Sequence, residues 1–77
     1  MGLFQKFSKH HKELDACLVK VINNAENNYK DAAQKEYQRF VEMLASLRKQ
    51  GALSEKQNAY YEDMRQKYEQ ELKGFHH

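Results

Sequence analysis

The sequence predicts a small all-α protein, and three observations carry the prediction. Proline is absent from the 77 residues and glycine occurs only three times. Lysine, glutamate, glutamine, alanine and leucine, which favour helices, recur along the whole chain. Apolar residues also recur at intervals of three and four, the spacing of one helix face. Because a chain this short forms at most one core, we expect a single helical domain over residues 1–77.

The first predicted helix covers about residues 3–23. Its apolar stripe consists of Leu3, Phe4, Phe7, Leu14, Leu18, Val21 and Ile22. Two further stripes predict helices over about 29–50 and 54–73. Gly51 suits the left-handed position that follows a helix end. Ser54 fits an N-cap, and Gln57 three residues later completes a capping box. The sequence therefore predicts a sharp turn between the second and third helices.

The boundary between the first two helices is less clear, because residues 23–28 contain four asparagines. Asparagine favours caps and turns over helix interiors. A break there gives an antiparallel three-helix bundle with short loops. Without a break, one long helix over 3–50 pairs with a much shorter one and leaves apolar surface that a second copy would cover. Both architectures are compatible with the sequence.

The second turn also carries a family resemblance. Residues 47–55, LRKQGALSE, followed by Arg65–Tyr68, resemble the hairpin turn of the YnzC-like small bacterial proteins. Residues 1–40 do not follow that family. The resemblance implies a helical hairpin around Gly51 and no activity.

Composition and motifs argue against several function classes. The chain has one cysteine, Cys17, and lacks an apolar stretch of membrane-spanning length, which favours a cytoplasmic protein. Cys17 borders the first apolar stripe, as an inert core thiol would. The pairs His10–His11 and His76–His77 lack the spacing of a helical zinc motif. With no phosphate-binding loop and no catalytic motif, we expect neither an enzyme nor a cofactor or metal site.

Tyrosine is the residue type that suggests a function. The five tyrosines outnumber the four phenylalanines, which is unusual for a simple bundle core. Tyrosine combines a large apolar body with a hydroxyl group and is enriched at protein interfaces. We therefore predict a protein–protein interaction module, such as an adaptor, chaperone, inhibitor or regulatory subunit, that binds a partner or forms a homo-oligomer. The predicted contact residues are Tyr37, Tyr60, Tyr61, Met64 and Tyr68.

Two alternatives use the basic residues and the N-terminal segment. A small helical nucleic-acid-binding protein would use Lys6, Lys9, Lys12, Lys20, Arg48 and Lys49. The net charge of +2 and the sequence pI of 8.7 are low for that class. Peripheral attachment to a membrane through Leu3, Phe4 and Phe7 is the least favoured of the three.

Overall fold

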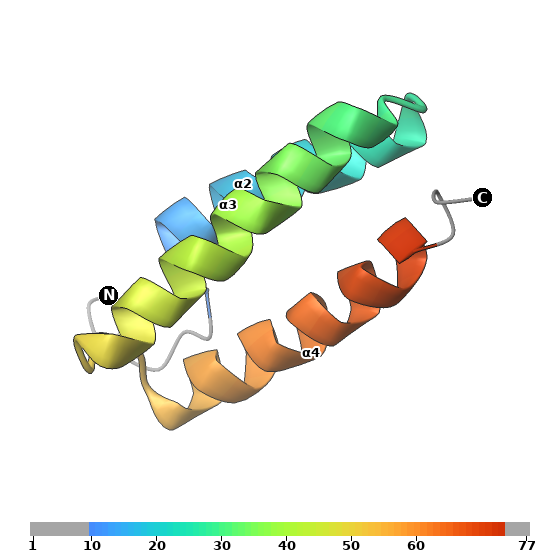
Figure 1. Cartoon of the computed structure of the whole chain (residues 1–77). Coiled ribbons are helices and arrows are strands. Elements are labelled where there is room, and N and C mark those ends of the chain that lie inside the picture. The colour runs from blue at the N-terminus through green and yellow to red at the C-terminus, as the bar shows by residue number, and fades with distance from the viewer. Residues whose placement is uncertain (1–9, 74–77) are drawn as a thin grey trace, which may run out of the picture.

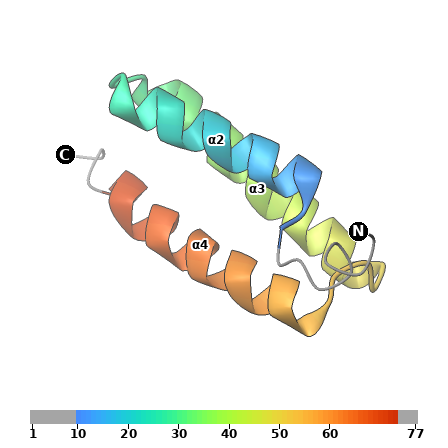
Figure 2. The ribbon, with the colours of Figure 1, turned by 180° about the vertical axis from the view of Figure 1, so that it is seen from behind.

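The computed structural model describes residues 10–73 as three α-helices in an up-down-up arrangement (Figure 1). They are α2 (Lys12–Glu26), α3 (Lys30–Lys49) and α4 (Glu55–Lys73). Helices α2 and α3 form an antiparallel pair, and α4 runs along one side of it (Figures 1 and 2). The predicted all-α bundle is confirmed, with no strand in the described part of the chain.

The asparagine-rich segment breaks the helix, so the alternative of one long helix over 3–50 is wrong. Asn28 adopts a positive φ of 63°, the left-handed conformation that ends many helices. The amide of Asn28 donates to the Ala25 carbonyl at 3.1 Å, and that of Tyr29 to the Asn24 carbonyl at 2.8 Å. These two bonds make a Schellman motif with asparagine in the position that glycine usually takes. Helix α2 therefore ends at Glu26, three residues later than predicted.

The second turn has the same geometry with glycine. Gly51 has a φ of 69°. Its amide donates to Arg48, and the Ala52 amide donates to Leu47, both at 3.0 Å. The Gln57 amide then donates to Ser54 Oγ at 3.1 Å, and Gln57 Oε1 accepts from the Ser54 amide at 2.8 Å. The predicted glycine C-cap and the capping box are both confirmed.

The first helix begins later than predicted within the described residues. His11 is extended (φ −124°, ψ 124°) and acts as the N-cap, its side chain accepting from the Leu14 amide at 3.5 Å. A helix running unbroken from residue 3 through His11 is therefore wrong. The predicted helical residues 3–9 lie outside the described part of the chain.

Two clusters of buried side chains hold the helices together. The larger one contains Leu14, Cys17, Leu18, Phe40, Leu44 and Tyr61. The smaller one contains Val21, Ala33 and Leu72. Only Tyr61 and Leu72 come from α4, so most of the buried apolar surface joins α2 to α3. None of the helices between Lys12 and Lys73 combines the length and the apolar character that a membrane span requires.

Candidate partner-binding groove

Tyr61 is not on the surface, which corrects its prediction as a contact residue. Its side chain is fully buried and packs against the Phe40 ring, with centroids 6.2 Å apart. The hydroxyl donates to Asp15 Oδ1 at 2.5 Å and accepts from the His11 amide at 2.5 Å. Burial is the main reason that the pKa of this hydroxyl lies well above its ordinary value, and the bond to Asp15 is the second. Through these two bonds, Tyr61 of α4 anchors the residues at the start of α2.

Tyr37 lies on a different side of α4 from Tyr60. It is half-buried, and its hydroxyl donates to the Arg65 carbonyl at 2.9 Å. Burial and the nearby Glu69 carboxylate raise the pKa of this hydroxyl. Tyr37 lines a hollow of about 230 Å³ between α3 and α4, together with Gln34, Gln38, Glu69, Leu72 and Lys73. Four of the six lining residues carry polar or charged side chains, and Tyr37 acts there as a link between two helices.

The other three predicted residues do share one surface. Tyr60, Met64 and Tyr68 are spaced four residues apart on α4, which places them along one face. They form one wall of a groove of about 250 Å³ between α4 and α2, whose other lining residues are Asp15, Leu18, Val19 and Ile22. The α2–α4 groove, as we name it, is mostly apolar. Val19, on the opposite wall, is 54% exposed.

Three acidic side chains lie in the α2–α4 groove or near Tyr68. Asp15 is part of its lining. The carboxylates of Glu71 and Glu26 lie close enough to Tyr68 that, together with burial, they raise the pKa of its hydroxyl. One cation also lies nearby, since the Lys67 ammonium is 5.3 Å from the centre of the Tyr68 ring. Asp15, Glu26 and Glu71, which we call the negative rim of the α2–α4 groove, thus outnumber the lysine that contacts the Tyr68 ring.

His10 is held at one end of the α2–α4 groove by three contacts. Its Nδ1 is 2.9 Å from Asp15 Oδ2. Its ring meets the Tyr60 ring edge-on, with centroids 5.2 Å apart. The Gln57 side chain donates to the His10 carbonyl at 3.3 Å. His10, the first described residue, therefore lies beside Tyr60.

On its α3 side, α4 carries a network of charged groups. Arg48 pairs with Glu62 at 3.1 Å and donates to the Asn58 side chain at 3.0 Å and to its carbonyl at 3.1 Å. Arg65 bridges Glu62 at 2.6 Å and Glu69 at 3.0 Å. The bonds from Arg65 are the main reason that the pKa of Glu62 falls to about 2.

These contacts bear on the predicted nucleic-acid surface. Arg48 is engaged in the fold through Glu62 and Asn58, whereas Lys12, Lys20 and Lys49 are exposed. Lys6 and Lys9 lie outside the described residues. Three of the six predicted cations, Lys12, Lys20 and Lys49, therefore lie at the surface of the described part of the chain.

Cys17 is buried in the larger cluster. Burial, with a further contribution from the Glu36 carboxylate, raises the pKa of its thiol. A thiol with a raised pKa is a poor nucleophile at neutral pH. Glu36 Oε1 is itself buried without a hydrogen-bond partner among the described residues. Within residues 10–73, no three histidine, cysteine, aspartate or glutamate side chains converge as metal ligands would. His76 and His77 lie outside these residues.

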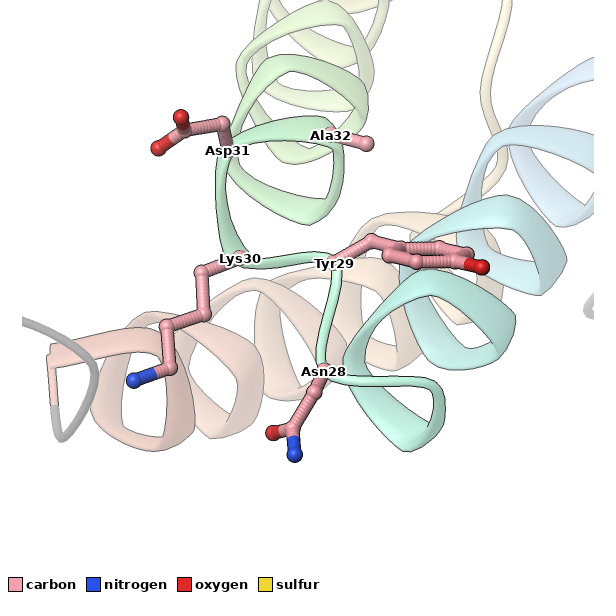
Figure 3. Close-up of a pocket in the computed structure, with 5 residues that line it drawn as sticks. All are labelled: Asn28, Tyr29, Lys30, Asp31 and Ala32. Atoms are coloured by element: carbon pink, nitrogen blue, oxygen red, sulfur yellow. The ribbon is translucent and has the colours of Figure 1, made fainter.

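A further hollow, of about 500 Å³, lies at the first turn and is lined by Asn28, Tyr29, Lys30, Asp31 and Ala32 (Figure 3). The labelled side chains point in different directions, Asp31 to one side of the chain and Lys30 and Asn28 to the other. Because a binding site needs polar groups that converge on one place, this hollow is a surface feature of the turn.

The α2 wall of the groove was missed by sequence reasoning. Leu18–Val19 and Val21–Ile22 are adjacent apolar pairs, and neighbouring residues on a helix point about 100° apart. The stripe of α2 is therefore too wide for one partner helix. Leu18 and Val21 are buried while Val19 and Ile22 face the groove. Stripe width was the signal that could have identified this second face.

Comparison of the chain with protein-family models, with curated proteins and with solved structures finds no significant match. The resemblance of the second turn to the YnzC-like proteins therefore has no support from a family model.

Proposed function

We propose that this protein is a protein–protein interaction module that binds an amphipathic helix of a partner in its α2–α4 groove. The observation that carries the proposal is the alignment of Tyr60, Met64 and Tyr68 opposite Val19 and Ile22. Binding of a helix in an apolar groove is a common mode of peptide recognition, in which side chains spaced three or four residues apart serve as anchors.

The groove chemistry also specifies the partner. Tyrosine and methionine present large apolar surfaces, and methionine adapts its shape to different side chains. The negative rim of Asp15, Glu26 and Glu71 favours lysine or arginine beside the apolar anchors and speeds the encounter with such a peptide. The proposed ligand is therefore a basic amphipathic helix with two or three large apolar side chains on one face.

A display library of random helical peptides tests the proposal with the purified full-length chain as bait. The expected outcome is enrichment of peptides with apolar residues three or four apart and with lysine or arginine between them. Val19→Lys, which places a cation on the groove wall, should weaken binding of an enriched peptide at least tenfold.

The matched control is Ala45→Lys, which adds the same side chain at an exposed position of α3. Helix α3 contributes no residue to the α2–α4 groove. If both lysine variants weaken binding equally, or if no peptide binds saturably, the α2–α4 groove is not the contact surface.

A further inference from the structure

We infer that residues 1–9 are the protein's own ligand for the α2–α4 groove and compete there with a partner. The inference rests on the proposed function in one respect only, which is that both ligands use the same groove. The described part of the chain begins at His10, which is held beside Tyr60 at one end of this groove.

The nine residues have the composition that the groove favours. Besides Met1, they contain three large apolar side chains, Leu3, Phe4 and Phe7, and two lysines, Lys6 and Lys9, with no acidic residue. In a helix, residues 3, 4 and 7 share one face, and residues 6 and 9 lie on the other side. The charge of +2 complements the negative rim of the groove.

The length also matches. Tyr60 and Tyr68 are eight residues apart on α4, which is about 12 Å at 1.5 Å per residue. A helix of nine residues is about 13 Å long, so residues 1–9 can cover the groove once the chain reverses at His10. Tethering at His10 keeps the segment at an effective concentration in the millimolar range, where even weak contacts fill the groove.

Nuclear Overhauser effects in the full-length chain test this inference directly. The expected signals join ring protons of Phe4 or Phe7 to methyl groups of Val19, Ile22 or Met64. They should persist unchanged on dilution, because the contact is within one chain. The inference is overturned if these signals are missing, or if they fade on dilution, which would assign the segment to the groove of a second copy.

Two variants check the origin of the signals. Phe4→Ser with Phe7→Ser should shift the methyl resonances of Val19 and Met64 but leave that of Ala45 in place. Val19→Lys should abolish the same Overhauser effects from the other side of the contact. Shifts spread equally over Ala45 would mean a general change of fold and would contradict a local contact.

Peptide affinity separates this inference from the proposed function. If the segment fills the groove in about nine chains of ten, Phe4→Ser with Phe7→Ser should raise the affinity for an enriched peptide about tenfold. Unchanged affinity together with missing Overhauser effects overturns the inference and leaves the proposed function standing. Overhauser effects without any peptide binding support the inference and count against the proposed function.

Discussion

The α2–α3 hairpin and the attachment of α4 are built in different ways. Within residues 10–73, helices α2 and α3 contribute seven of the nine buried core residues, nearly all of them aliphatic or aromatic hydrocarbon. Helix α4 contributes Tyr61 and Leu72 and packs the half-buried Tyr60, Met64 and Tyr68 against the same core. Polar contacts of Tyr37 and Arg48 also join it to α3. The third helix therefore depends more than the hairpin does on oriented polar contacts, and a groove lies on either side of it.

The largest expected effect comes from the apolar centre of the hairpin. Phe40 is fully buried and contacts the rings of both Tyr37 and Tyr61. Phe40→Ala should lower the free energy of unfolding by about 3–5 kcal/mol, since it removes a ring and leaves a cavity. Phe40→Leu, a smaller change in volume, should cost about 1 kcal/mol. Urea unfolding measures both changes in stability. Equal losses for the two variants would contradict side-chain packing as the source of the stabilisation by Phe40.

Removal of one hydroxyl tests the attachment of α4. Tyr61→Phe keeps the ring and deletes the bonds to Asp15 and His11, so it should cost about 1–3 kcal/mol. Amide exchange should rise first at the start of α2. Tyr37→Phe is the matched control and should cost about 1 kcal/mol, because its hydroxyl is only half-buried. A larger loss of stability for Tyr37→Phe than for Tyr61→Phe would contradict the expectation that the Tyr61 hydroxyl contributes more.

The charged network predicts a smaller effect that depends on pH. The folded-state pKa of Glu62, about 2, is below its ordinary value of 4.5. The unfolded chain therefore binds more protons between these values, and the stabilisation by Glu62 is full above pH 4.5 and is lost as the pH falls toward 2. Because the carboxylate is partly exposed, the effect should stay within about 1 kcal/mol.

Glu62→Gln supplies the control for this prediction. Thermal unfolding of this variant should depend less on pH between 4.5 and 2 than that of the unsubstituted chain. If the unfolding temperatures of the two proteins depend equally on pH in that range, Glu62 is not the source of the pH dependence.

The two turns give the smallest expected effect. Asn28→Gly places the residue without a Cβ at the left-handed position within the hairpin and should stabilise the protein by a few tenths of a kcal/mol. Gly51→Asn makes the opposite change before α4 and should destabilise it by a similar amount. Thermal unfolding of the two variants and of the double variant measures both signs. Stabilisation by Gly51→Asn would contradict the shared geometry of the turns.

Several features of the fold were predictable because they depend on neighbours in the sequence. The Gly51 turn and the Ser54–Gln57 capping box involve residues a few positions apart. The break at residues 27–29 was only one of two alternatives, because asparagine is tolerated both in a left-handed cap and on the polar side of a helix. The start of α2 was missed, since it depends on contacts of His11 with Tyr61, 50 residues away.

The candidate groove was half predictable for the same reason. Tyr60, Met64 and Tyr68 follow from helical spacing along α4. Spacing alone could not tell that the adjacent Tyr61 is buried against Phe40, or that Tyr37 turns to the other side of α4. Those outcomes depend on how α4 packs against α3.

The sequence by itself determined three amphipathic helices, the second turn and an excess of tyrosine, because local spacing and capping depend on residues close in the chain. The tertiary structure alone decided which tyrosine hydroxyl is buried and which aromatic face is open. It did so because the packing of Phe40 and Tyr61 and the bond from Tyr61 to Asp15 set how closely α4 approaches α2. The exposure of Val19 and the half-buried placement of Tyr60, Met64 and Tyr68 are consequences of that approach.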